Sequence, residues 1–256
     1  MPRTSSLAGL SFAALVALAG CSSPVSEVKE ASAPATSAEA TEEASVPATS
    51  ATPSAEAETG TYSSAELADI LGGISEADGV ALQVIPGEQF EQSMDQARQF
   101  LESVAATPEQ CKIFVANSLE VPEGAGHATG VSSTNGDAVQ TIVSASSSAD
   151  PAYTQQRIDA SDAALSSCSS FSLDARGEVI EQTVEAVDAV TEAETTYGSL
   201  TTQSTSDGSK QETMTVIGAR GDLAVTAIRT AQALPEGTQE DLQDLIDETL
   251  AAAGQS

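Results

Sequence analysis

The chain has 256 residues, with 38 Asp and Glu residues against 9 Lys and Arg residues and a formal net charge of −29. This balance excludes recognition of nucleic acid by a basic patch, because phosphate binding requires clustered Lys and Arg side chains. No apolar run reaches the roughly 18 residues of a membrane-spanning helix, which excludes a multi-pass membrane protein, and no collagen or coiled-coil period is present.

The first twenty residues have the pattern of a secretory signal peptide. A short start with one basic residue, Arg3, precedes a largely apolar run of 13 residues at 7–19. At about 1.5 Å per residue, such a helix spans roughly 20 Å, which is too short for a hydrocarbon core of about 30 Å. We therefore expect a cleaved signal rather than a membrane anchor.

The end of this segment resembles the lipobox of bacterial lipoproteins. Leu18, Ala19 and Gly20 precede Cys21, and in such proteins the signal is cut before the Cys, which then carries lipid. The alternative is an ordinary signal peptide with a chance Cys. We expect Cys21 to be lipidated, with palmitate-type acyl chains, and to hold the protein on the extracytoplasmic face of the cell membrane.

Residues 21–60 are expected to be the lipidated Cys21 followed by a disordered acidic tether. Residues 22–60 are mostly Ala, Ser, Thr, Glu and Pro, with seven acids, one base and Val as the only large apolar residue type. Such a segment cannot bury enough apolar surface to offset its ordering entropy. At about 5–6 Å per square-root residue, these 39 residues reach roughly 35 Å. The tether would hold a folded domain away from the membrane.

The rest of the chain, 61–254, is expected to form one folded domain. It contains 31 acids and 7 bases, which gives a net charge of −24. The acids are spread along the domain, so a solvated surface explains them best, and an acidic face for a cationic partner is the alternative.

The front of this domain is predicted to be helical. Ser63 and Glu66 form a capping box that opens the first helix, and a Gly pair is expected to end it. A second helix at 88–104 places apolar residues at steps of four, three, four and three. Thr107 is expected to cap a third, short helix that contains Cys111.

Two more helices are predicted further along the chain. Asp150 and Pro151 open one that ends at Cys168, and the last helix is 238–253. Like charges four residues apart make the last helix weak by itself, so its apolar face must dock on a sheet while its acids face water. A calcium site is the alternative, but the Asp-x-Asp-x-Asp-Gly loop is absent. The acids concerned are Glu240, Asp241, Asp244, Asp247 and Glu248.

Between these helices the sequence predicts a run of strands. Asn135 and Gly136 mark a hairpin, and further turns are expected at Gly177, Gly208 and Gly221. Helices first, then strands, then a closing helix predict an α+β fold with a single antiparallel sheet covered by helices. The predicted strands are 128–134, 138–145, 171–173, 178–190, 197–205, 212–219 and 223–229.

Cysteine usage gives the clearest chemical signal. Once Cys21 is assigned to lipid, Cys111 and Cys168 remain, and such a pair in an extracytoplasmic domain usually forms a disulfide. The alternatives are weaker. No Cys-x-x-Cys is present, a zinc site could add only His127, and a catalytic thiol would need a neighbouring His.

No pattern typical of a catalytic or cofactor site is found. The chain has no Gly-x-Ser-x-Gly, His-Glu-x-x-His, Walker A or Gly-x-Gly-x-x-Gly motif, so we assign no catalytic residue, metal or cofactor. His127 is interpreted as a surface or capping residue rather than a general base. A glycosidase carboxylate pair is not excluded by counting, although a chain without Trp has few aromatic side chains on which a sugar could stack.

Several of these features together resemble a known group of proteins. A lipobox, a tether rich in Ser, Thr, Pro and Ala, and a domain with Cys on two helices resemble actinobacterial surface lipoproteins. The domain itself resembles the extracellular sensor domain of PknH-type Ser/Thr kinases. This resemblance implies a non-enzymatic, ligand-sensing fold with a cleft, and it carries over no ligand residues. The matching segments are 63–71, 107–111, the helix that ends at Cys168, 219–228 and 242–250.

We therefore expect a lipid-anchored, monomeric, extracytoplasmic ligand-binding or sensor-like domain that is not an enzyme. The alternatives are a carrier of lipids or glycolipids and, less favoured, an envelope hydrolase. A large dry cavity would favour the carrier, whereas a shallow cleft would favour the sensor. A net charge of −24 repels anions over a Debye length of about 8 Å, so a neutral or cationic envelope ligand is expected.

Overall fold

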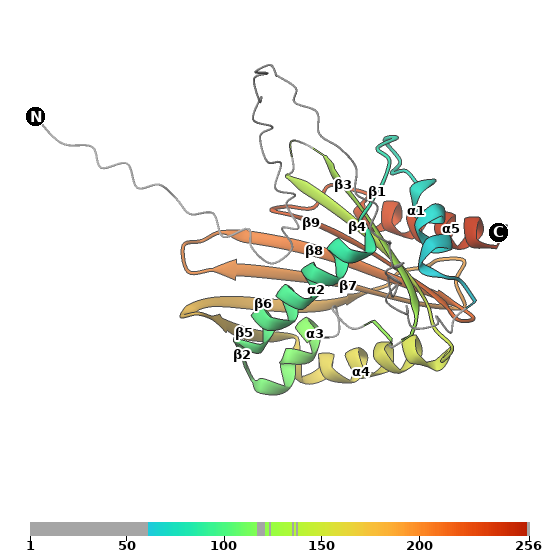
Figure 1. The fold of residues 1–256 in the computed structure, drawn as a ribbon. Coiled ribbons are helices and arrows are strands. Elements are labelled where there is room, and N and C mark those ends of the chain that lie inside the picture. The colour runs from blue at the N-terminus through green and yellow to red at the C-terminus, as the bar shows by residue number, and fades with distance from the viewer. Residues whose placement is uncertain (1–60, 117–120, 123, 135, 137, 255–256) are drawn as a thin grey trace, which may run out of the picture. The chain divides into compact units, whose positions relative to one another are not determined.

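The computed structural model describes residues 61–254 apart from 117–120, 123, 135 and 137. Over these residues the chain forms five α-helices, a short 3-10 helix and one nine-stranded sheet, which is the single α+β domain predicted from the sequence (Figure 1). The signal peptide, Cys21 and the tether lie outside the described residues. None of the described helices has the length and hydropathy needed to cross a membrane.

All neighbouring strands of the sheet are antiparallel, in the order β1-β3-β4-β9-β8-β7-β6-β5-β2. Strands β3 and β4 pair as the predicted hairpin requires, with Thr134 opposite Val139, while Asn135 of the predicted turn lies outside the described residues. The strands are β1 (Gln83–Val84), β2 (Val104–Thr107), β3 (Gly126–Thr134), β4 (Val139–Ser147), β5 (Ser170–Ala175), β6 (Glu178–Val187), β7 (Thr195–Thr205), β8 (Lys210–Arg220) and β9 (Leu223–Ala231).

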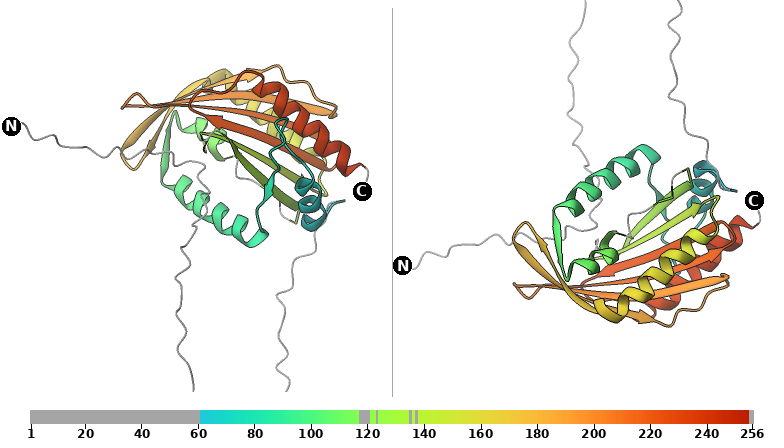
Figure 2. Two further views of the ribbon diagram at one scale, coloured as in Figure 1. Left: turned by 90° about the horizontal axis from the view of Figure 1, so that it is seen from above. Right: turned by 90° about the horizontal axis from the view of Figure 1, so that it is seen from below.

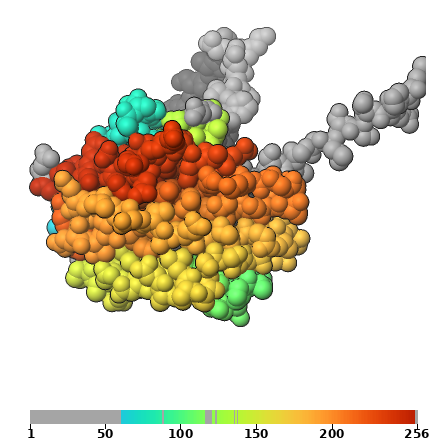
Figure 3. All heavy atoms as spheres, turned by 180° about the vertical axis from the view of Figure 1, so that it is seen from behind, coloured from blue at the N-terminus to red at the C-terminus, as the bar shows by residue number. Residues whose placement is uncertain are grey.

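One face of the sheet, which we call the closed face, is covered by α1 (Ser64–Gly72) and α5 (Thr238–Ala253). The predicted capping box is present at Ser63 and Glu66 and satisfies two free backbone N–H groups at the start of α1. Ile246 of α5 is fully buried over Gly218 of β8, where a side chain would leave it no room. Seen from behind, α5 and the adjacent strands form a continuous surface (Figure 3).

The other face carries α2 (Gly87–Glu102), η1 (Glu109–Lys112), α3 (Ile113–Ala116) and α4 (Ala152–Cys168). A second apolar core lies here, at the β2, β5 and β6 end of the sheet, and includes Leu101, Phe171, Leu173 and Val184. Figure 2 shows α2 and α5 on opposite sides of the sheet. The two helix layers therefore leave β4, β9 and β8 with one face under α5 or α1 and the other facing α2, while β7 also contacts α4 through a 3.0 Å hydrogen bond from Thr195 to Gln155.

Three predicted boundaries were wrong. Helix α2 stops at Glu102, and Val104 belongs to β2, where Val104 and Ala106 are buried and Ala105 between them is exposed. Thr107 is the last residue of β2 rather than a helix cap, and Pro108 precedes η1. Strand β6 ends at Val187, which leaves Val190 exposed. In the first case the helical spacing ran on by chance into a β-branched residue that pairs with β5.

The expectation that all acids of α5 face water was correct for Glu240, Asp244 and Glu248, which are exposed, but wrong for Asp241 and Asp247. Asp241 accepts a 2.6 Å hydrogen bond from Arg229, and Asp247 accepts one of 2.7 Å from the Glu192 backbone. These two carboxylates fasten the helix to the sheet and to the loop before β7.

Candidate functional site

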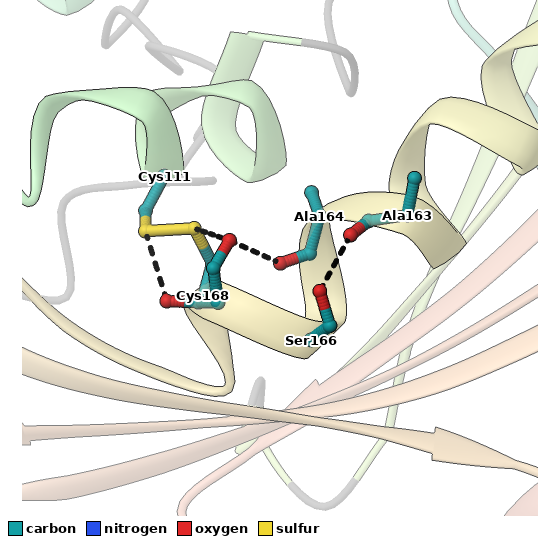
Figure 4. The surroundings of a disulfide bond; sticks show 6 residues. Cys111, Ala163, Ala164, Ser166 and Cys168 are labelled. Atoms are coloured by element: carbon teal, nitrogen blue, oxygen red, sulfur yellow. Dashed lines mark hydrogen bonds between the residues drawn. A yellow bond between two sulfur atoms is a disulfide. The ribbon is translucent and has the colours of Figure 1, made fainter.

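The predicted disulfide is confirmed. Cys111 of η1 and Cys168 at the end of α4 are bonded, with their Cα atoms 5.4 Å apart, and both are fully buried (Figure 4). The bond fastens η1, and with it β2, to α4 beside the second core. Because both sulfurs are oxidised and buried, this pair is a structural disulfide crosslink and not a reactive thiol site.

A buried ion pair lies on the closed face, at the opposite end of the domain core from the disulfide. Arg229 of β9 donates to Glu76 at 2.5 Å, to Asp241 at 2.6 Å and to the Thr141 hydroxyl at 3.0 Å. The Glu76 carboxylate also accepts hydrogen bonds from Ser132 and Thr141. Every charge in this cluster has partners, so it serves to hold the 74–82 loop and α5 on the sheet rather than to bind a ligand.

A cavity of about 230 Å³ lies where α1, the start of α2 and the edge of β3 meet. Strand β1 pairs with Gly130 and Val131, and the Ile85 N–H donates to the Thr129 carbonyl at 2.9 Å, so strand pairing on this edge of β3 ends at Thr129. There α1 takes the place of a strand, since the His127 N–H donates to Ser64 Oγ at 2.9 Å. The cavity is lined by Ser64, Ala65, Ala68, Ile85, Gly87, Phe90, His127, Ala128 and Thr129.

His127 is the titratable group of this cavity, and it is partly buried against Phe90 rather than a fully exposed surface residue. Its imidazole stacks on the Phe90 ring at 4.4 Å between centroids and 28° between planes. Burial lowers the pKa of His127 to about 4, so the ring is neutral at pH 7. A neutral imidazole offers one hydrogen-bond donor and one acceptor, and no described residue hydrogen-bonds either ring nitrogen.

The sheet face that looks toward α2 is uncharged, and we call its central part the neutral face. It consists of every second residue of β3 from His127 to Ser133, of β4 from Gln140 to Ser146, of β9 from Ala224 to Thr230, of β8 from Thr213 to Ala219 and of β7 from Thr195 to Thr201. Most of these side chains carry a hydroxyl group, and none carries a carboxylate or an amine.

The apolar side chains of the neutral face form a strip. The register places Val131, Ile142 and Ile228 next to one another across three strands. Hydroxyl side chains and the Gln140 amide flank this strip, and two pairs hydrogen-bond across strands, Thr129 with Ser144 at 2.9 Å and Thr213 with Thr230 at 3.1 Å.

Strand β9 is buried on its closed side and half-exposed on its neutral side, whereas Thr129 of β3 and Ser199 of β7 are buried on the neutral face. On the closed face of β9, Val225 and Ala227 have no exposed surface, because α5 packs directly on them. On the neutral face of β9, Thr226 and Ile228 are half-exposed. Helix α2 crosses in front of this face (Figure 1) without sealing it.

Helix α2 is attached to the rest of the domain at its two ends. Phe90 near its start stacks on His127, and Leu101 at its end is buried in the second core. Between these points Met94 and Ala97 remain half-buried on the stripe that the sequence predicted to be apolar. The helix therefore bridges the sheet as a strap whose middle is not packed into either core.

The sequence pointed to none of these binding features. Along each strand, the residues of the neutral face alternate with core residues of the closed face, which is the pattern of any amphipathic strand. Only the register between strands places the neutral-face residues side by side. The described residues hold no cluster of three potential metal ligands. Cys21, the proposed lipidation site, lies outside them.

No protein-family model matches the chain, and no curated protein matches it. Among solved structures, the extracellular domain of PknH from Mycobacterium tuberculosis is similar, with 11% identity, a TM-score of 0.45, and coverage of 74% of this chain and 92% of that one. A putative uncharacterized protein from Mycobacterium smegmatis, a Rv0999 ortholog, has 18% identity and a TM-score of 0.38, with 59% of this chain and 76% of that one covered.

The first of these agrees with the resemblance to PknH-type sensor domains expected from the sequence. Both TM-scores lie below 0.5, so the function of this chain has to be argued from its own residues.

Proposed function

We propose that this chain is a lipid-anchored, extracytoplasmic, non-enzymatic binding domain that holds an uncharged, hydroxyl-rich ligand, such as a neutral glycan of the cell envelope, on the neutral face beneath α2. The observation that carries this proposal is the composition of that face. In a domain of net charge −24, this partly exposed sheet surface has no charged side chain.

The chemistry of the neutral face favours a sugar chain. An apolar strip flanked by rows of hydroxyl groups matches a glycan, whose ring faces are apolar and whose edges carry hydroxyl groups. A charged ligand would lose its hydration without gaining a counter-charge on this surface. The acids elsewhere on the domain would repel an anion as it approached, and salt would screen this repulsion beyond about 8 Å.

The cavity beside β3 does not by itself support the carrier alternative. Drug-sized ligands occupy pockets of about 300–1,000 Å³. The cavity beside β3 has about 230 Å³, which is too little for a lipid tail and headgroup together. A hydrolase would need converging titratable groups, and the cavity contributes only the neutral imidazole of His127.

The ligand proposal can be tested with a panel of neutral, anionic and cationic oligosaccharides and peptides, scored by thermal shift and NMR titration. Thr226→Glu places a charge in the middle of the neutral face and should weaken glycan binding at least tenfold. Thr183→Glu is the matched control, because Thr183 is an exposed strand residue outside that face. Selective binding of peptides, or equal binding by both variants, would contradict the proposal.

The anchor is supported by the Leu18–Cys21 motif and by the composition of the tether. Cys21→Ala should release the protein from the membrane fraction or stall its processing, because no acyl chain would be attached. Mass spectrometry of the mature N-terminus should find diacylglycerol on Cys21 in the unchanged protein. Recovery of the Cys21→Ala protein in carbonate-washed membranes would show that another element anchors it.

A further inference from the structure

The cavity beside β3 has no side chain that fills it. Its walls are made by small residues, Ala65 and Ala68 from α1, Gly87 from α2 and Ala128 from β3. Protein interiors are close-packed, and voids larger than a water molecule are few in a domain. A space of about 230 Å³ is larger than the cavities that are known to take up a benzene-sized molecule.

The cavity is open to ligands at the first turns of two helices. Ala65 and Gly87 line it and are exposed, so its mouth lies between the start of α1 and the start of α2. Phe90 forms an aromatic wall, and His127 lies against that wall with ring nitrogens that no described residue bonds. The space is therefore mostly apolar. The Ser64 and Thr129 hydroxyl groups in its walls are engaged with the His127 N–H and with Ser144, and the His127 ring carries the remaining hydrogen-bonding atoms.

The cavity also adjoins the neutral face. His127 and Thr129 belong to both, since they occupy the corner of the neutral face on β3. A chain lying across that face would reach the cavity with one of its ends, where Ala68 and Ile85 offer apolar contacts instead of hydroxyl groups.

We propose that this cavity is a specificity pocket for a small uncharged ring or branched apolar group that bears one hydrogen-bonding atom, held between Phe90 and α1 and bonded to the His127 imidazole. The role of this cavity as the end pocket of the neutral face rests on the proposed function. As a binding site for small molecules it can be tested separately.

The test is an NMR titration of the full mature chain with four probes of similar size: phenol, benzene, cyclohexanol and benzoate. Phenol should produce saturable shifts of amides in α1 and at the start of β3, with a millimolar dissociation constant. Benzoate should bind at least tenfold more weakly, because its charge would be desolvated without a partner. The absence of saturable shifts with all four probes, or benzoate binding as tight as that of phenol, would overturn the assignment.

Two substitutions locate the binding. Ala68→Leu fills the cavity and should weaken phenol binding at least tenfold without lowering the melting temperature, whereas Ala163→Leu on the exposed side of α4 should change neither. His127→Leu removes the hydrogen bond, so phenol should lose affinity while benzene keeps it. Unchanged phenol binding by Ala68→Leu would place the probe elsewhere and contradict the proposal.

The outcome separates the pocket from the wider binding surface. Thr226 lies two strands away from Thr129, so Thr226→Glu should leave phenol binding intact. If neutral glycans fail to bind and phenol still enters the cavity, the pocket stands and the glycan assignment falls. If glycans bind equally well to Ala68→Leu and to the unchanged chain, the pocket is not their end site.

Discussion

Arg229, a buried cation in a strongly acidic domain, joins three parts of the chain that are far apart in sequence. Its guanidinium reaches Glu76 in the loop before β1, Asp241 at the start of α5 and Thr141 on β4. In the sequence Arg229 was only the last residue of a predicted strand. The inward alternation of β9 carries it into the interior, where the fork of five N–H donors can bond several acceptors at once.

Replacement of one member of this ion pair is expected to cost more than replacement of both. Arg229→Met leaves Glu76 buried without a counter-charge and should lower the free energy of unfolding by about 3–5 kcal/mol. The double variant Arg229→Met with Glu76→Leu should recover most of that loss, because an apolar pair needs no charge compensation. Urea unfolding at pH 7 measures both. A single variant within 1 kcal/mol of the wild type would refute this account.

His127 is expected to make the domain less stable in acid. The pKa of its imidazole is about 4 in the folded protein and 6.5 in the unfolded chain, so the unfolded state binds the proton first. Its contribution to stability is complete above pH 6.5 and is lost as the pH falls toward 4. With allowance for partial exposure of the ring, the loss amounts to about 2–3 kcal/mol.

The measurement is urea unfolding of the wild type and of His127→Gln at pH 7 and pH 4. Carboxylates protonate in the same range, and comparison of the two proteins removes their contribution. The variant should lose less stability between the two pH values than the wild type, by the amount given above. Equal losses would show that the imidazole is protonated as readily in the folded state as in the unfolded chain.

Among the structural elements, the segment from α2 to α3 depends on its attachments rather than on its own packing. Helix α2 contacts the domain at its ends, and the short η1 and α3 follow directly after β2. Isolated helices of this length are marginal in water. The disulfide between η1 and α4 closes the far end of this segment, so the position of α2 over the neutral face depends on it.

Removal of the disulfide should therefore destabilise the domain and make helix α2 more mobile over the neutral face. The two Cys residues are 57 positions apart, and chain-entropy arguments give about 4 kcal/mol for a loop of that length. The double variant Cys111→Ser with Cys168→Ser should lower the melting temperature by well over 5 °C. Hydrogen exchange should rise in α2 and α3 before it rises in α5. Two alkylated thiols in the denatured, non-reduced wild type would show that the bond does not form.

On the scale of the whole molecule, most of the charge lies on the surface and off the neutral face, and the buried exception is the Arg229–Glu76 ion pair. Exposed acids such as Glu240, Asp244 and Glu248 repel one another at low ionic strength, while the buried Glu76 is neutralised by Arg229. A net charge far from zero keeps a protein soluble and lowers the stability of its compact state. The domain should thus respond to salt as a whole.

We expect the melting temperature to rise by several degrees between about 10 mM and 500 mM NaCl at pH 7, because the Debye length falls from about 30 Å to only a few Å. The triple variant Glu240→Gln, Asp244→Gln and Glu248→Gln should be more stable at low salt and should gain less from added NaCl. Differential scanning calorimetry measures both. A melting temperature that is independent of salt would mean that the surface acids do not repel one another appreciably.

Features that depend on neighbouring residues were determined by the sequence itself. The capping box of Ser63 and Glu66, the closing helix at 238–253 and the hairpin at Asn135 and Gly136 were all predicted in place, because capping, helical spacing and turns involve residues within a few positions of one another. The pairing of Cys111 with Cys168 followed from the number of available cysteines.

Features that join distant residues were decided only by the tertiary structure. Val104 became a strand residue because β5 was there to pair with it, and His127 became partly buried because α1 and Phe90 lie against it. The neutral face exists only through the register of five strands. The physical reason is that burial and pairing depend on which segments meet across the sheet, and local propensity carries no information about that choice.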